Sequence, residues 1–108
     1  MNNLPKSIFD LIDMQDFRKR TAMYIGDKKI SSLNSFIDGY LYATQTNNIE
    51  LEDNVQFGDF HDWVSRNFKW KESTSGWRRI ILQECNGDEG EALKKFFELY
   101  DLFKSRNR

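Results

Sequence analysis

The segment Asp59–Asp62 reads DFHD and is the place in the chain where titratable side chains gather around a histidine. A general base or a metal site would need these groups on one face. His61 and Asp62 are neighbours, so on a helix their side chains point about 100° apart. One turn after His61 comes Ser65, which is a poor metal ligand. The pattern therefore favours a solvent-facing histidine in the first turn of a helix that Asp59 caps.

The other nucleophiles lack activating partners. Cys85 is the one cysteine, no second histidine is present to activate it, and the adjacent carboxylate of Glu84 would raise its pKa. We expect Cys85 to be a core residue. No serine is placed by the sequence beside a base with a supporting acid, and no GxxxxGK[ST] or GxGxxG loop occurs. We therefore expect no catalytic residue, no metal site and no cofactor.

Helical periodicity dominates the elements that would position any site. Residues 49–58 are acidic and show no sustained period, so we predict a loop there. Candidate helix starts are Pro5, Asp13, Ser31 or Ser32, Asp59, Thr74 or Ser75, and Asp88. With no confident strand, the chain is predicted to be all-α, a compact orthogonal bundle of five to six helices in a single domain over residues 1–108.

The predicted helices carry apolar stripes, and 15% of the residues are aromatic. These large side chains are sufficient to form a hydrophobic core in a chain of 108 residues. Asn86-Gly87 is a typical helix stop, and Asp88 with Glu91 forms a capping-box pattern. The inward-facing residues are predicted to be Leu33, Phe36, Ile37, Tyr40, Leu41 and Thr44; Phe60, Trp63, Val64 and Asn67 or Phe68; Trp77, Ile80, Ile81 and Glu84 or Cys85; and Leu93, Phe96, Phe97, Tyr100 and Phe103.

Charge is strongly segregated behind a net charge of −1. Residues 30–65 contain six acids and no Lys or Arg, whereas residues 66–79 contain five bases and one acid. The acidic residues of an uninterrupted block repel one another, which lowers stability. Such a block can serve a function by attracting a basic partner. The alternative is that the acids coat one solvated face.

A nucleic-acid-binding domain and a membrane protein fit the sequence less well. Arg18-Lys19-Arg20 and Arg78-Arg79 are basic, and Trp70 and Trp77 could stack on bases. However, the sequence pI is about 5.8, the acidic block would repel phosphate, and Trp77 lies on an apolar stripe.

No stretch approaches the ~18 apolar residues of a membrane span, and the N-terminal residues turn acidic where a signal peptide needs an apolar run. We expect a cytoplasmic protein.

The stretch RKRTAMYIG, residues 18–26, resembles the RKRPGMYIG segment near the start of type II topoisomerase ATPase subunits. In that family an ExxxN magnesium box and Gly-rich ATP-lid motifs follow within a much longer domain. The next predicted helix here reads SLNSFIDGYLYATQTN and has no such box. The similarity is local and implies no ATPase activity.

A second resemblance covers most of the chain. The ordered motifs MYIG, SLNSFIDGY, FHDWV, ESTSGWRRIIL and GDEGEALKKFFELYDLF resemble a family of small bacterial immunity-type proteins of toxin systems, including contact-dependent growth inhibition. The resemblance implies a cytoplasmic protein that forms a heterodimer with one cognate toxin domain and blocks its active site. Many delivered toxins are nucleases, which need a basic cleft to hold phosphates.

The segment from Glu50 to Asp62 carries acidic residues but no Lys or Arg and lies beside aromatic residues. It is our candidate partner surface, because loops often carry recognition residues and aromatic residues often anchor interfaces. Asp59 is also a candidate helix cap, Asp53 a candidate turn residue and Trp70 a candidate core lid. A regulatory or adaptor domain with another protein partner stays open, as does a nucleic-acid-binding domain. The predicted partner-binding residues are Glu50, Glu52, Asp53, Asp59 and Asp62, with Trp70 and Glu72 as a second patch.

Overall fold

The computed structural model describes residues 8–46, 52–69 and 76–106, and for residues 45 and 52–57 the backbone alone. Over these ranges the chain forms helices and no strand, which confirms the all-α prediction. The helices are α1 (Ile8–Asp13), α2 (Gln15–Lys19), α3 (Thr21–Ile25), α4 (Ile30–Thr46), α5 (Glu52–Asn67), α6 (Gly76–Glu84) and α7 (Glu89–Ser105). None of these helices is long and apolar enough to cross a bilayer.

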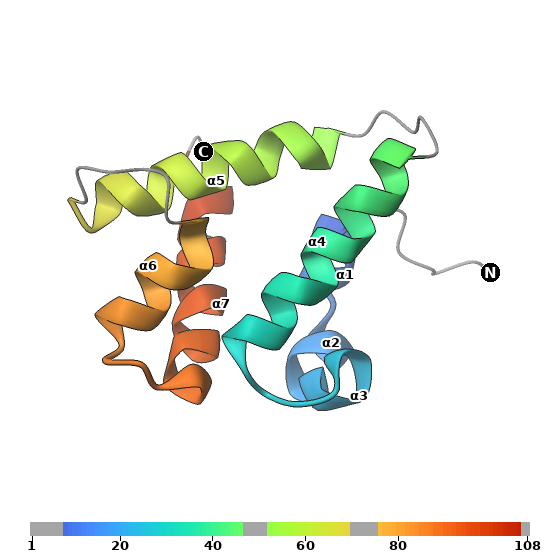
Figure 1. The fold of residues 1–108 in the computed structure, drawn as a ribbon, viewed down its shortest axis with the longest axis horizontal. Helices are drawn as coiled ribbons and strands as arrows, with labels where there is room; N and C mark the ends of the chain where they lie inside the picture. Colours follow the sequence, from blue (N-terminus) through green and yellow to red (C-terminus); the bar gives the residue numbers. More distant parts are fainter. Residues whose placement is uncertain (1–7, 47–51, 70–75, 107–108) are drawn as a thin grey trace.

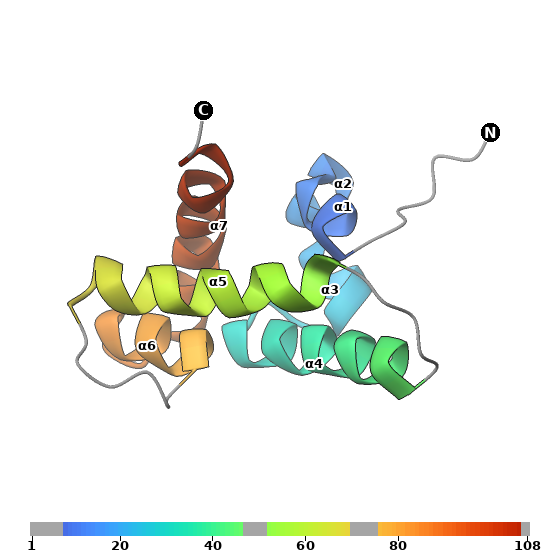
Figure 2. The same cartoon turned by 90° about the horizontal axis from the view of Figure 1, so that it is seen from above.

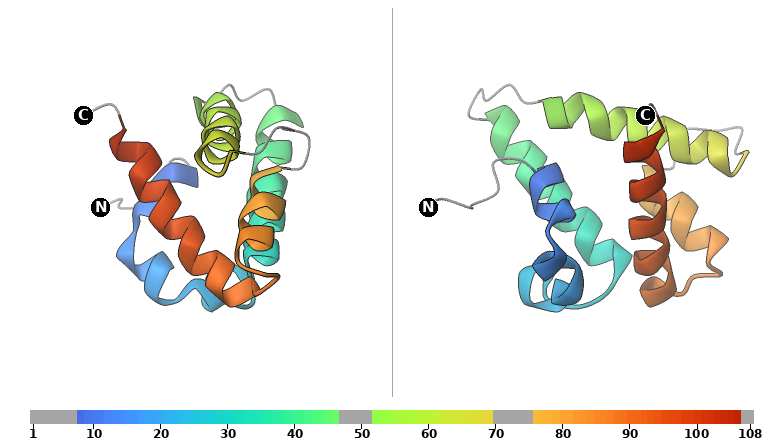
Figure 3. Two further views of the ribbon diagram at one scale, coloured as in Figure 1. Left: turned by 90° about the vertical axis from the view of Figure 1, so that its left-hand side faces the viewer. Right: turned by 180° about the vertical axis from the view of Figure 1, so that it is seen from behind.

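The helices form two layers bridged by a crossing helix (Figure 1). Helices α4 and α6 lie on one side, and α7 lies on the other side with the short helices α1 to α3 (Figure 3). Viewed from above, α5 runs along the seam between the two layers, crosswise to α7 (Figure 2). This crossing agrees with the predicted orthogonal packing, and it leaves the outer side of α5 facing away from the bundle.

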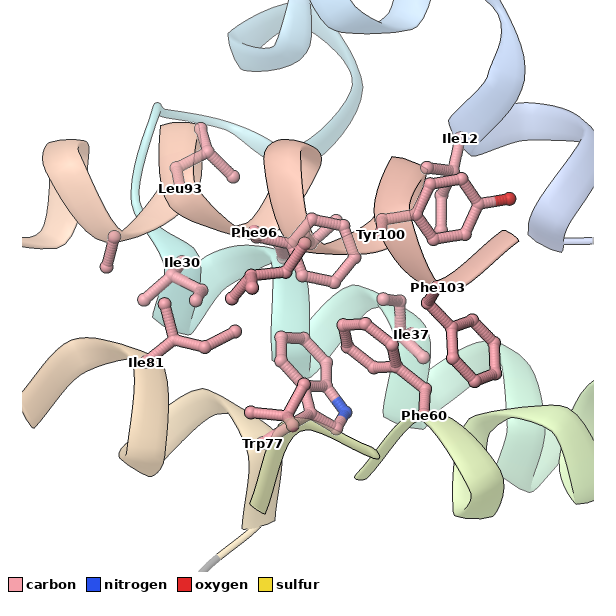
Figure 4. Packing of buried hydrophobic residues seen from close by; sticks show 14 of the residues in the cluster. Ile12, Ile30, Ile37, Phe60, Trp77, Ile81, Leu93, Phe96, Tyr100 and Phe103 are labelled. Atoms are coloured by element: carbon pink, nitrogen blue, oxygen red, sulfur yellow. The ribbon is translucent and has the colours of Figure 1, made fainter. Parts of the chain in front are cut away.

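Helix α7 supplies the centre of the core (Figure 4). The ring of Phe60, from α5, is fully buried and lies 5.6 Å from that of Phe96 and 5.3 Å from that of Phe103, centroid to centroid. Trp77 of α6 packs at 6.0 Å from the same Phe60 ring. Edge-to-face pairs of this kind add to the free energy gained from burial. The cluster therefore joins three helices through one side chain.

The predicted apolar stripes are largely confirmed. Asn67 and Glu84 are exposed, so Phe68 and Cys85 are the inward-facing choices at those positions. Buried or packed against the core are Leu33, Phe36, Ile37, Tyr40, Leu41, Thr44, Phe60, Trp63, Val64, Phe68, Trp77, Ile80, Ile81, Cys85, Leu93, Phe96, Phe97, Tyr100 and Phe103.

Three predicted helix starts are wrong, and one of them, Asp59, lies inside α5. Helix α2 begins at Gln15, and Met14 rather than Asp13 occupies the N-cap position, without a side-chain capping bond. Helix α4 begins at Ile30, ahead of the predicted caps Ser31 and Ser32. Ile30 is fully buried, so packing extends the helix to include it. The predicted starts at Pro5 and at Thr74 or Ser75 lie outside the described residues.

The segment TAMYI, to which the sequence assigned no element, forms α3, so the described residues form seven helices where five to six were expected. The helix ends at Gly26, whose φ of 98° is left-handed and whose N–H donates to the carbonyl of Ala22 at 2.9 Å. Glycine adopts this conformation without the steric penalty of a Cβ atom. A single helical turn is too short to show a period in the sequence.

The predicted junction between α6 and α7 is confirmed. Asn86 and Gly87 have φ of 58° and 82°, and their N–H groups donate to the carbonyls of Gln83 at 3.0 Å and Leu82 at 2.8 Å. This is the double bond pattern of a Schellman stop. The Asp88 carboxylate accepts the Glu91 N–H at 2.9 Å and so caps α7. Asp88 donates its own N–H to Cys85, so only half of the capping box forms.

The burial of Tyr100 gives the fold a dependence on alkaline pH. Its hydroxyl donates to the carbonyl of Phe9 at 3.3 Å, and burial, followed by the negative charge of Asp13, raises its pKa well above the ordinary value of 10.0. Below pH 10.0 the phenol is neutral in both states, and its contribution to stability is complete. Above that pH the unfolded chain loses the proton and the folded chain keeps it, so the free energy of unfolding falls.

Above the pKa of Tyr100 in the unfolded chain, we expect the loss of its proton on unfolding to lower the free energy of unfolding by up to about 1.4 kcal/mol per pH unit. Urea unfolding of wild type and Tyr100→Phe between neutral and alkaline pH measures this slope. The variant should lose less stability over the alkaline range than wild type does. Tyr42→Phe, at a residue 71% exposed, is the control. Parallel curves for wild type and Tyr100→Phe would contradict the expectation.

Candidate functional site

Two of the predicted partner-binding carboxylates lie together on α5. Asp59 and Asp62 are three residues apart, so they share one face of the helix, and both are exposed. Neither forms an ion pair or a hydrogen bond with any residue that the structure describes. The two charges are therefore available to a partner on a regular helix.

The loop predicted for residues 49–58 is wrong from Glu52 onward. Helix α5 begins at Glu52, so the backbones of Glu52 and Asp53 lie in its first turn. Acidic residues are favoured there by the helix dipole. The helix continues through Gly58, and Asp59 lies inside it rather than at its N-cap.

The remaining predicted contacts are not placed by the structure. Glu50, Trp70 and Glu72 lie outside the described residues. The second patch that combines Trp70 with Glu72 therefore stays a prediction, and the candidate acidic surface rests on Asp59 and Asp62, with Glu52 and Asp53 earlier on the same helix.

His61 does not occupy the position that the sequence predicted. It lies within α5 rather than in a capped first turn, and it is half-buried rather than solvent-facing. Among the described residues no group of three His, Cys, Asp or Glu side chains could hold a metal ion. The DFHD segment therefore supplies exposed carboxylates, on either side of a half-buried imidazole.

Cys85 packs at the edge of the core, as predicted. Burial raises the pKa of its thiol above the ordinary value of 9.0; Lys95 opposes this shift, and Glu91, Asp88 and Glu84 add to it. A thiol with a raised pKa is protonated at neutral pH and is a poor nucleophile.

Two of the basic side chains considered for nucleic-acid binding are engaged inside the protein. Arg18 donates both terminal nitrogens to the Asp101 carboxylate, at 2.9 and 2.8 Å, and its Nε to the carbonyl of Ile12 at 2.9 Å. Arg78 donates to the Ser31 hydroxyl at 3.2 Å. Trp77 is 7% exposed, so its ring cannot stack on a base. These positions hold helices together.

Ser31 lies at the centre of a contact that joins three helices. Its N–H and hydroxyl donate to the two oxygens of the Glu89 carboxylate, at 3.0 and 2.8 Å. The first N–H groups of a helix have no partner within the helix, and the Glu89 carboxylate of α7 accepts one of these N–H groups of α4. Arg78 of α6 completes the contact. The start of α4 is therefore fixed from the opposite layer.

An open groove of about 500 Å³ beside this contact was not predicted. It lies between α3 and the first two turns of α4. Its walls combine three apolar side chains with three hydroxyls: Tyr24, Ile25 and Phe36, with Ser31, Ser32 and Ser35. The sequence carried no signal for it, because the groove arises where the unpredicted helix α3 packs beside α4.

Comparison with known proteins does not assign a function to the acidic surface or to the groove. No protein-family model matches it, and neither curated proteins nor solved structures provide a match.

Proposed function

We propose that this chain is a cytoplasmic immunity protein that binds one cognate toxin domain through the acidic face of α5. The observation that carries the proposal is the pair of exposed carboxylates, Asp59 and Asp62, on a helix within residues 30–65, where no Lys or Arg is present. A nuclease is the toxin class that this surface fits, because its active-site cleft must be cationic to hold phosphates.

The proposed inhibition is occlusion of that cleft. Carboxylates of α5 take the positions of substrate phosphates, and the helix fixes their spacing before binding, which limits the entropy lost on association. Phe60, on the same helix, is fully buried in the core, so α5 is held at its centre while Asp59 and Asp62 stay outside. Complementary charge also accelerates encounter, so the association rate should fall as salt is added.

Reversing the charge of α5 tests the proposal. The probe is the purified product of the open reading frame next to this gene, measured by calorimetry at low and moderate salt. We expect Asp59→Lys with Asp62→Lys to weaken binding at least ~100-fold, since close charge pairs across an interface contribute about 1.5–7 kcal/mol. Adding Glu50→Lys, Glu52→Lys and Asp53→Lys should remove the decrease of affinity with added salt, and co-expression should no longer protect cells.

The control is the same change in charge on another helix. Glu91→Lys with Glu98→Lys alters two exposed carboxylates of α7, each paired with a lysine on that helix. This variant should bind and protect like wild type. Unchanged affinity of the folded α5 variant would show that the contact surface is wrong, and continued killing beside soluble wild-type protein would contradict the immunity function itself.

A further inference from the structure

The two aromatic side chains that line the groove between α3 and α4 both pack on one buried ring. Phe17 is fully buried, and its ring centroid lies 5.1 Å from that of Tyr24 and 6.5 Å from that of Phe36. The Tyr24 hydroxyl donates to the Asp16 carboxylate at 2.7 Å, which fixes the outer end of that ring. A groove whose walls are fixed before binding loses little entropy when it is filled.

One serine that lines the groove is held in place, whereas two others have hydroxyls without a partner among the described residues. Ser31 is held by Glu89 and Arg78. Ser32 and Ser35 also line the groove, and their hydroxyls bond to no residue that the structure describes. Apolar walls with a few polar groups are the usual composition of a binding site.

Two cationic side chains lie in the turn beside the groove. Lys28 and Lys29 are exposed in the turn that joins α3 to α4, the two helices whose residues line the groove. The nearby acids are already engaged. Asp27 accepts the Lys29 N–H at 3.1 Å, and Asp16 accepts the Tyr24 hydroxyl and lies 3.5 Å from the Arg20 guanidinium. The two lysines therefore remain available to anionic groups of a partner.

A large apolar side chain is also exposed on α3. Met23, on α3 next to Tyr24, is 77% exposed, and Tyr24 itself is 37% exposed. Methionine is flexible and polarizable, and it is common at surfaces that bind other proteins. A hollow, an exposed methionine and two lysines thus occur together within one turn and the helices that it joins.

We propose that this groove binds a short acidic segment of a protein partner, with one aliphatic or aromatic side chain between Tyr24 and Phe36 and with carboxylates against Lys28 and Lys29. The proposal is independent of the acidic face of α5. A protein segment fits better than a nucleic acid, because apolar side chains and hydroxyls line the hollow, a composition that suits an amino-acid side chain.

Selection of short random peptides displayed on phage, with the whole chain as bait, tests the proposal without a known partner. We expect the selected peptides to be rich in Asp and Glu around one apolar residue. Fluorescence anisotropy of the synthesised peptides then measures affinity at physiological salt. Lys28→Glu with Lys29→Glu should weaken binding at least tenfold, and Ser35→Trp, which fills the groove without changing its charge, should do the same.

The matched control is Lys94→Glu with Lys95→Glu, an adjacent lysine pair on α7 that should leave affinity within twofold of wild type. The double variant Asp59→Lys with Asp62→Lys should also bind the peptides normally, so failure here is distinct from failure of the proposed toxin surface. Selection of neutral or basic peptides, no enrichment, or equal binding to the groove variants would overturn the proposal. So would preferential binding of single-stranded oligothymidylate at this groove.

Discussion

Replacing Phe60 by alanine is expected to lower the free energy of unfolding by about 3–5 kcal/mol, the range for loss of a buried aromatic ring. Phe60 is fully buried, and its ring contacts rings from three other positions on α6 and α7, at centroid distances of 5.3 to 6.0 Å. The cavity would lie where α5, α6 and α7 meet, so no single helix could shift to fill it. Domains are stable by only about 5–15 kcal/mol, so the variant would be close to unfolding at moderate temperature.

Urea unfolding followed by circular dichroism measures the loss for Phe60→Ala. The control is Tyr42→Ala, which removes an aromatic ring that is 71% exposed on α4. Surface substitutions usually change stability by less than about 0.5 kcal/mol. If the two variants lost similar stability, the position assigned to Phe60 at the centre of the core would be wrong.

Arg18→Ala is expected to cost about 1.5–2 kcal/mol, because Arg18 donates three charge-assisted hydrogen bonds, of which the one to the Ile12 carbonyl is partly buried and the two to Asp101 are exposed. The Arg18 side chain is 19% exposed and joins α2 to α7 through both oxygens of Asp101. Its guanidinium carbon also lies 5.1 Å from the centroid of the Phe97 ring. The Asp101 hydrogen bonds are the first cause of the raised pKa of Arg18. Alanine removes these contacts and leaves the carbonyl of Ile12 without this donor.

A second substitution separates the ion pair from the packing. Asp101→Asn keeps one acceptor for Arg18, leaves the guanidinium over Phe97, and should cost about 1 kcal/mol. Arg79→Ala, at an exposed position of α6, should stay within about 0.5 kcal/mol of wild type in the same thermal and urea experiments. An Arg18→Ala variant as stable as Arg79→Ala would contradict the structural role of Arg18.

The apolar stripes could be predicted because their spacing is a local property of the chain. Leu33 and Ile37 on α4, and Phe96 and Tyr100 on α7, recur at one helical turn, and all four are buried. The stop at Asn86-Gly87 was equally readable, because left-handed backbone strongly favours these residue types.

Helix starts were less predictable because tertiary contacts decide them. Ser31 looked like a cap, yet it lies inside α4 and donates its N–H to Glu89, 58 positions further along the chain. Asp59 looked like a cap because it follows a glycine, whereas α5 continues through Gly58. A cap and an internal residue with a distant partner have the same local sequence, so spacing alone could not separate them.

The candidate acidic surface was predictable in charge but not in shape. The absence of Lys and Arg from residues 30–65 is visible in the sequence, and it directed attention to Asp59 and Asp62. The placement of these carboxylates depends on packing between distant segments, because they project from a helix that crosses two layers. The groove beside Tyr24 depends entirely on such packing, since its walls come from a turn-length helix and from the next helix in the chain.

The position of α7 in the sequence has a consequence for biosynthesis. Phe96, Tyr100 and Phe103 fill the centre of the core, and this helix is tied back to the first ones by the bonds from Tyr100 to Phe9 and from Arg18 to Asp101. A nascent chain on the ribosome therefore exposes the apolar faces of α1 to α6 until α7 emerges. Chaperones that recognise such faces should bind the incomplete polypeptide and release it once α7 has left the ribosome and packed against the other helices.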